Sequence, residues 1–179
     1  MATTTTVVVP PDNPTVIDEI TLSAAATYTS KSWSAESFRI IKAELVGTQS
    51  AFSYTRFQFN ALATNIYSDV GTNTSSGGGV AFDGANFGTN GFARLGVVSP
   101  AAAGASSTRQ LIEFNPRVNG AARMGKASSG SFYVVGAMAD HFARSVEFAC
   151  SDAATPLTFF TLSWNAATFT GRVLVEGYP

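Results

Sequence analysis

Residues 53–62 read SYTRFQFNAL, and the alternation of side-chain types in this stretch decides the fold class. Apolar and polar residues follow one another in turn, which is the pattern of a β-strand with one buried face. The inward face is predicted to hold Thr55, Phe57, Phe59 and Ala61. A chain with such a strand needs a second layer to cover the phenylalanines.

Similar runs occur along most of the chain, and they predict an all-β protein. They are short, rich in β-branched and aromatic residues, and separated by Gly, Asn, Ser and Pro, which favours an antiparallel β-sandwich, jelly-roll-like in character. The 179 residues suit one such domain, over residues 16–179, preceded by an extended arm over residues 1–15. The further strands are predicted at 15–23, 36–47, 65–70, 92–99, 109–114, 121–127, 131–139, 144–150, 157–164 and 169–176.

Local irregularities are predicted at three places between these runs. The apolar face changes sides between Ile40 and Ile41, which suggests a β-bulge. The pair Asn119 and Gly120 is a strong hairpin-turn signal. Residues 138–142, MADHF, are expected to form one helical turn, and no helix longer than about two turns is expected.

The composition points to a surface that other molecules cover. Only 13% of the residues are charged, 45% are hydrophobic, and the formal net charge is −1. A soluble monomer usually carries more surface charge, so we expect contact with neighbouring subunits, the alternative being a neutral extracellular domain. The scattered basic residues predict no nucleic-acid groove. No signal peptide and no membrane insertion are expected, so synthesis in a cytoplasm is predicted.

The arm is predicted to dock on a neighbouring subunit. Pro10 and Pro11 keep the backbone extended and remove two hydrogen-bond donors, so residues 1–15 do not suit a central strand. A disordered leader is the alternative interpretation. The apolar side chains expected to bind the partner, in the arm and the strand after it, are Val7, Val8, Val9, Ile17 and Ile20.

Residues 71–91 are predicted to form a long irregular surface loop, because glycine recurs among Asn, Ser and Thr. The side chains expected to present a binding surface there are Phe82, Asp83, Asn86 and Phe87. The alternative is that the phenylalanines pin the loop to the core. Asp69 and the polar loop residues do not have the spacing of an EF-hand, so no calcium site is predicted.

The residues that most often perform catalysis are scarce. His141 is the only histidine and lies in no recognisable nucleophile motif, and Cys150 is the only cysteine and is expected to be a buried, inert thiol. One histidine and one cysteine do not make a zinc site. We therefore predict no enzyme activity, no metal and no cofactor.

From residue 36 to residue 179 the chain resembles β-sandwich modules of tailed-bacteriophage virions, of the tail-fibre, tail-tip and head-decoration type. The resemblance lies in the order of features. YTRFQFNAL is followed by the Gly-rich GTNTSSGGGVAFDG, then by QLIEFNP and FYVVGAMA, and the closing segment is LTFFTLSWNAATFTGRVLVEGYP. An aromatic residue, a glycine, alternating apolar residues and a second glycine mark the last strand of such modules, and Phe169, Gly171, Val173, Val175 and Gly177 stand in those places.

The resemblance implies a non-enzymatic structural protein of a virion, made in the host cytoplasm. Its expected partners are other virion proteins and copies of itself, with a trimer as one option, and a host receptor or glycan. The alternative is a carbohydrate- or receptor-binding module that stacks sugars on exposed aromatic side chains. The candidates for that role are Trp33, Tyr67, Phe82 and Phe87, whereas Trp164 is expected in the core.

Overall fold

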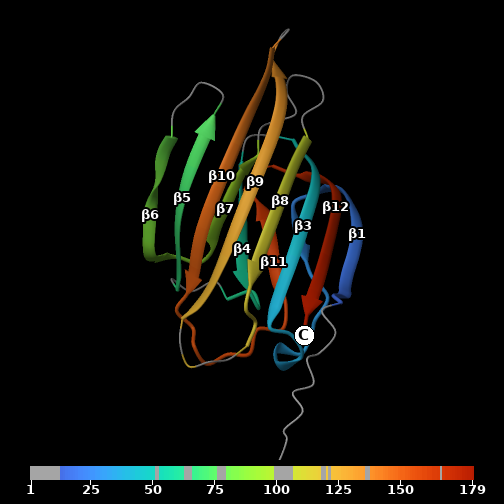
Figure 1. Ribbon diagram of the computed structural model, residues 1–179, viewed down its shortest axis with the longest axis vertical. Coiled ribbons are helices and arrows are strands. Elements are labelled where there is room, and N and C mark those ends of the chain that lie inside the picture. The colour runs from blue at the N-terminus through green and yellow to red at the C-terminus, as the bar shows by residue number, and fades with distance from the viewer. Residues whose placement is uncertain are drawn as a thin grey trace, which may run out of the picture.

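The computed structural model shows two antiparallel β-sheets packed face to face (Figure 1). The predicted antiparallel β-sandwich is thereby confirmed. The larger sheet has eight strands and the smaller has four, and the one helix of the described residues is the 3₁₀ turn η1 (Ala35–Ser37). The structure describes residues 13–50, 53–62, 66–75, 80–98, 107–117, 120, 122–135, 138–165 and 167–179.

The larger sheet has the order β1-β12-β3-β8-β9-β10-β5-β6. The smaller sheet, of order β2-β11-β4-β7, lies behind it in the view of Figure 1. The strands of the larger sheet are β1 (Thr15–Ala25), β3 (Ile40–Gln49), β5 (Tyr67–Ser75), β6 (Val80–Asn90), β8 (Ser107–Phe114), β9 (Arg123–Val135), β10 (Met138–Cys150) and β12 (Phe169–Tyr178). Those of the smaller sheet are β2 (Thr27–Thr29), β4 (Ser53–Phe59), β7 (Ala93–Val98) and β11 (Phe160–Trp164).

The core lies between the sheets and is aromatic at its centre. The alternation in β4 is confirmed for Thr55, Phe57 and Phe59, which are fully buried. The prediction is wrong for Ala61, which is exposed because the strand ends at Phe59 and the chain turns there. The ring of Phe57 lies 4.7–5.5 Å, centroid to centroid, from four other phenylalanine rings, which come from β4, β8, β10 and β11. Each sheet therefore supplies rings that the other sheet covers.

The closing strand β12 also has one apolar face that points into the core. Phe169, Val173 and Val175 are buried. Gly171 interrupts the pattern because it lies opposite Gly47 of β3, where the two backbones approach closely. A Cβ atom on Gly171 would lie 2.3 Å from the carbonyl oxygen of Val46, so glycine is needed at this crossing.

The predicted loop at 71–91 is wrong. Residues 67–75 and 80–90 form the antiparallel pair β5 and β6 at one edge of the larger sheet. The pairing shifts register at Tyr67–Asp69 and again at Asp69–Gly71. Such bulges break the alternation of side chains while the backbone ladder continues, so a Gly- and Asn-rich edge strand reads as a loop.

Two other local predictions are also wrong. No register shift interrupts the pairing of β3 with β12 or with β8, so the expected bulge at Ile40 and Ile41 is absent from these ladders. The strand begins only at Ile40, and Phe38 belongs to the connection after η1. Residues 138–142 are not a helical turn, because they open β10, whose pairing with β9 continues without a shift from Met138 to Cys150.

The two ends of the domain meet in the larger sheet. β1 begins at Thr15, the last residue of the predicted arm, and pairs with β12 along most of its length. On its other side β12 pairs with β3, so the closing strand lies between two strands from the first third of the chain. The backbone of Arg39 donates a hydrogen bond to the carbonyl of Tyr178 at 2.8 Å.

Candidate functional site

The candidate site is the outer face of the larger sheet, which faces the viewer in Figure 1 and is not covered by the smaller sheet. Because its strands pair in unbroken register from β12 to β10, residues on neighbouring strands line up in rows across the sheet. We call this surface the ladder face. Three of its rows carry the side chains described below.

The charged row crosses five strands with alternating sign. Glu176 of β12 lies opposite Lys42 of β3, Lys42 opposite Glu113 of β8, Glu113 opposite Lys126 of β9, and Lys126 opposite Glu147 of β10. Opposite charges that face each other across strands stabilise a sheet modestly, typically by about 0.2–1 kcal/mol a pair. The row therefore fixes a charge pattern on the surface more than it holds the sheet together.

Glu113 is the centre of this row. Its carboxylate lies 3.2 Å from Nζ of Lys126 and 3.8 Å from Nζ of Lys42. The ammonium of Lys42 also lies 4.5 Å from the centre of the Tyr178 ring. Burial, and then the neighbouring carboxylate of Glu176, raise the pKa of Tyr178, so this phenol stays neutral and donates its hydrogen bond to Glu176.

Two more rows lie beside the charged one. The first carries Leu174, Glu44, Leu111, Ser128 and Ser145 on successive strands from β12 to β10. The second carries Arg172, Val46, Arg109, Gly130 and Ala143 on the same strands.

In these two rows the large side chains lie on β12, β3 and β8, and the small ones lie on β9 and β10. Nε of Arg109 joins the two rows, because it donates a 2.5 Å hydrogen bond to Glu44.

Apolar side chains are exposed among these charges. Val46, Val70 and Leu111 are 42–45% exposed, and Met124 is 63% exposed. Surface apolar residues are ordinary when single, but a set of them on one sheet face is a feature of contact surfaces. The ladder face therefore combines paired charges with uncovered apolar area.

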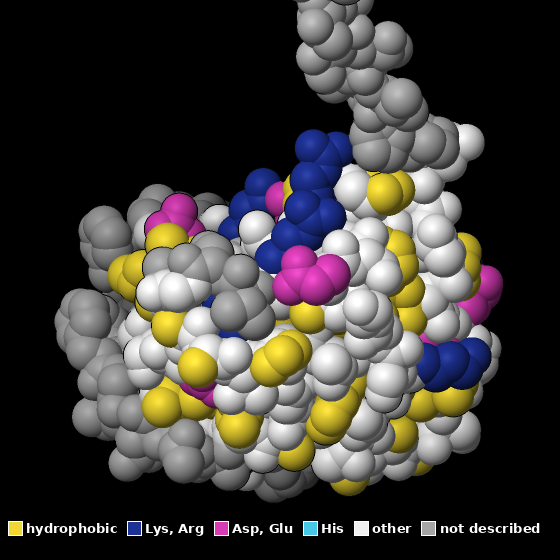
Figure 2. Space-filling view, turned by 90° about the horizontal axis from the view of Figure 1, so that it is seen from below, with side chains coloured by type: hydrophobic (Ala, Val, Ile, Leu, Met, Phe, Trp, Pro, Cys, Tyr) yellow, Lys and Arg dark blue, Asp and Glu magenta, His cyan; other side chains and the backbone are white. Residues whose placement is uncertain are grey.

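The ladder face is hollowed over β8 and β9. One hollow of about 400 Å³ is lined by Leu111, Ser128, Ser145 and the Lys42–Tyr178 pair, among others. A second, of about 330 Å³, lies at the lower end between Arg39, Glu113 and Met124. Figure 2, seen from below, shows Lys and Arg side chains gathered beside Asp and Glu side chains, with hydrophobic side chains around them.

The structure places the predicted binding residues in different settings. Ile20 lies on the edge strand β1 and is 41% exposed, whereas Ile17 packs against the core. The side chains of Phe82, Asp83, Asn86 and Phe87 lie outside the described part of the chain, although their backbone belongs to β6. Val7, Val8 and Val9 also lie outside the described residues.

Two of the aromatic candidates for sugar stacking are buried. Trp33 is 7% exposed and packs against Phe114 and Phe160, and Tyr67 is fully buried and accepts a hydrogen bond from the backbone of Phe59. Their burial removes both from any surface site. Trp164 is buried as predicted, and so is Cys150, whose thiol pKa is raised by burial.

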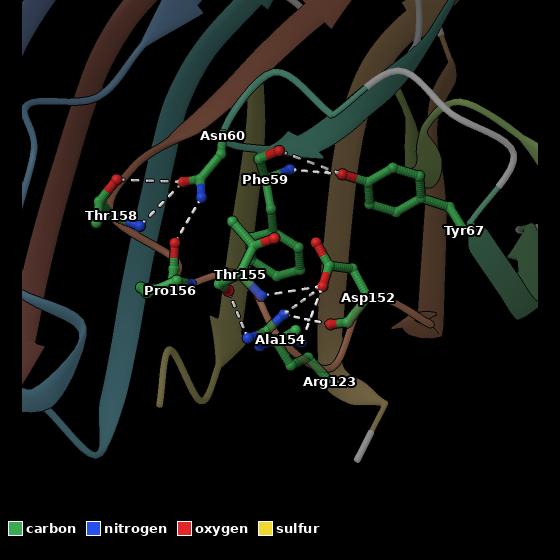
Figure 3. Close-up of polar contacts among 9 residues, drawn as sticks. All are labelled: Phe59, Asn60, Tyr67, Arg123, Asp152, Ala154, Thr155, Pro156 and Thr158. Atoms are coloured by element: carbon green, nitrogen blue, oxygen red, sulfur yellow. Dashed lines mark hydrogen bonds and ion pairs between the residues drawn. The ribbon is translucent and has the colours of Figure 1, made fainter. Parts of the chain in front are cut away.

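A polar cluster at the lower end of the domain holds the connection from β10 to β11 (Figure 3). The buried guanidinium of Arg123 donates hydrogen bonds to the carbonyls of Asp152 and Thr155. The carboxylate of Asp152 accepts the backbone N–H groups of Ala154 and Thr155 at 2.9 and 3.0 Å. The turn at residues 152–155 is thus held by the Asp152 carboxylate from within and by the Arg123 guanidinium from β9.

Asn60 holds the other half of the same connection. Its side-chain nitrogen donates to the carbonyl of Pro156 at 2.6 Å, and its oxygen accepts the backbone N–H groups of Thr158 and Phe159 (Figure 3). Asn60 has a φ of 46°, a left-handed conformation that asparagine tolerates better than most residues. The lower connection is therefore held by side chains from both sheets.

Acid is expected to weaken this connection. The hydrogen bonds from Thr155 and then from Ala154 hold the pKa of Asp152 below 3.8. A carboxyl group with a lowered folded-state pKa stabilises the fold above its unfolded pKa, and that contribution is lost as the pH falls through the folded-state pKa. In urea unfolding, the wild type should lose stability relative to Asp152→Asn between about pH 5 and about pH 2. A constant difference between the two proteins would contradict this.

A buried ion pair closes one edge of the smaller sheet. Asp69 of β5, with a fully buried side chain, accepts the backbone N–H of Arg94 at 3.2 Å and pairs with its guanidinium at 3.2 Å. Arg94 lies on β7, which ends the smaller sheet. Asp69 therefore bonds an N–H that this edge strand would otherwise leave unpaired.

Within the described residues, no group of three or more His, Cys, Asp or Glu side chains is arranged to hold a metal ion. No helix in the described part of the chain is long and apolar enough to span a membrane. A scan against protein-family models and a search of curated proteins found no match.

Proposed function

We propose that the chain is a non-enzymatic structural subunit of a bacteriophage virion, of the fibre, tail or capsid-decoration kind. It assembles with copies of itself and with other virion proteins through its N-terminal arm and the ladder face. The observation that carries the proposal is the ladder face, a broad sheet surface with apolar side chains exposed between fixed charges. The order of strands and turns that resembles virion modules also supports it.

The low charge of the chain gives further support. Only 13% of the residues are charged, and several of the described charges are paired with one another on the ladder face. Paired charges lose part of their hydration before any partner binds, so covering them costs less than covering isolated charges. Such a face suits a lasting contact in an assembly.

The first test is the mass of the protein in solution, measured by light scattering. The full chain is expected to have a mass that is a multiple of 18.7 kDa. A variant that lacks residues 1–12 keeps β1 intact and is expected to form smaller assemblies, because the arm contributes one of the two contacts. A mass of 18.7 kDa for the full chain at all concentrations would contradict self-assembly.

The assignment to a virion needs a separate test. Antibodies against the folded chain are expected to label purified particles of the encoding phage in immunogold electron microscopy. Peptides of the chain should also appear in the mass spectrum of those particles. Particles that lack both signals would contradict the assignment, whatever the oligomeric state of the isolated protein.

A further inference from the structure

The two halves of the ladder face are complementary to each other. The larger sheet has four strands on each side of the line between β8 and β9, which is therefore its centre line. A rotation of 180° about an axis that runs parallel to this line, just above the ladder face, would place β9 of a second copy over β8 of the first and β10 over β3, at the same height along the strands. The rows of the two copies would then face each other.

The charges match under this rotation. Glu113 of one copy faces Lys126 of the second copy, and Lys42 faces Glu147, because each pair lies at equal distances from the centre line. The two-fold axis repeats each of these contacts, so the charged rows of the two copies would form four attractive pairs. Glu147 has no ion pair among the described residues of its own chain, and in this arrangement Lys42 of the second copy would supply its counter-charge.

The sizes of the side chains match as well. Leu111 of one copy faces Ser128 of the second, Arg109 faces Gly130, and Val46 faces Ala143. The large side chains of β3 and β8 thus meet the small ones of β9 and β10. The hollow of about 400 Å³ that Leu111 and Ser128 line lies where the two faces would meet.

We propose that two copies of this chain pack ladder face to ladder face about a two-fold axis along the line between β8 and β9. This inference rests on the self-assembly in the proposed function and names its partner and geometry. Packed sheets keep their strand directions within about 30° of each other, and two sheets whose strands both run parallel to the axis fall within that range. The contact is isologous, so it builds dimers or higher two-fold assemblies rather than a three-fold ring.

The area is sufficient for a stable dimer. Eight strands spaced about 4.8 Å apart make the face roughly 34 Å wide, and nine residues of strand make it roughly 30 Å long. The footprint is therefore on the order of 1,000 Å² for each copy. Specific interfaces bury about 800 Å² for each partner.

Charge reversal provides a test that only an intermolecular contact can pass. Glu113→Lys places two lysines opposite each other in the dimer, and Lys126→Glu places two glutamates opposite each other. Each variant alone is expected to self-associate at least tenfold more weakly than the wild type in sedimentation velocity. Mixed in equal amounts, the two variants should form a heterodimer, because each new charge then meets its opposite. A mixture that stays as weakly associated as its components would overturn the proposal.

Gly130→Phe tests the same contact without changing charge. A Cβ atom at Gly130 would meet nothing within 4 Å in the described part of the subunit, so there is room for a side chain to leave the sheet there, and we expect the fold to be kept. In the dimer the new ring would collide with Arg109 of the second copy, and association should fall at least tenfold. Thr27→Phe, on an exposed position of β2 in the smaller sheet, is the matched control and should associate as the wild type does. Circular dichroism melting curves check that each variant is folded.

The outcomes separate this inference from the proposed function. The wild type could self-associate while Gly130→Phe and both charge variants associate just as strongly. That result would overturn the ladder-face dimer, but self-assembly through other surfaces would still stand. A wild type that is a monomer at every concentration would overturn both. Loss of association in Gly130→Phe but not in Thr27→Phe supports the two-fold contact.

Discussion

Phe57→Ala is expected to lower the free energy of unfolding by about 3–5 kcal/mol. Phe57 is fully buried, and its ring contacts phenylalanines from both sheets. Truncation to alanine removes buried apolar area and leaves a cavity that the surrounding rings cannot fill without leaving their rotamers.

Urea unfolding followed by tryptophan fluorescence measures this loss, since Trp33 and Trp164 are both buried in the core. Phe57→Leu is the control, because it keeps most of the volume and should cost clearly less. The exposed substitution Thr27→Ala should cost under about 0.5 kcal/mol. A loss below about 1 kcal/mol for Phe57→Ala would mean that the two sheets do not pack through this ring.

Asp69→Ala is expected to cost about 3 kcal/mol, the second largest effect. The substitution leaves the Arg94 guanidinium, with 23% of its side chain exposed, without its carboxylate, and it removes the acceptor of the Arg94 backbone N–H. Removing one partner of a buried pair costs about 3–5 kcal/mol, and the partial exposure of Arg94 places the loss at the lower end. Burial raises the pKa of Asp69, and the bonds and charge of Arg94 oppose that rise.

Asp69→Asn separates the two contributions in the same urea experiment. Asparagine can still accept the Arg94 N–H but carries no charge, so it should cost less than alanine does. Equal losses of stability for the two variants would show that the charge of Asp69 stabilises the fold, and that its hydrogen bond with the Arg94 backbone N–H contributes little. If Asp69→Ala unfolded at the same urea concentration as the wild type, this pair would have no role in joining β5 to β7.

The sandwich was predictable from the sequence where one strand face is buried and the other is exposed. β4 alternates throughout, and β12 does so apart from Gly171, because their inward side chains meet the same core. The alternation fails in β5 and β6, where bulges shift the register and glycine carries no side chain to mark a face. Without that alternation the sequence there resembles a loop, although the backbone ladder continues.

The candidate site was not predictable, for a different reason. Glu176, Lys42, Glu113, Lys126 and Glu147 come from five strands spread over most of the chain, and in each strand the charge is only an ordinary outward residue. Their alternation exists only after the strands pair in register. The local sequence instead predicted Trp33 and Tyr67 as exposed binding residues, whereas both rings are buried in the core.

The position of β12 between β1 and β3 has a consequence for synthesis on the ribosome. About 140 residues separate the end of β1 at Ala25 from the start of β12 at Phe169, and β12 is the only sheet neighbour of β1 among the described strands. At roughly 5–20 residues per second, β1 waits roughly 7–30 s for its neighbour to be made. During that interval both edges of β1 are open to other nascent chains, so crowded polysomes are where this protein is most exposed to mispairing.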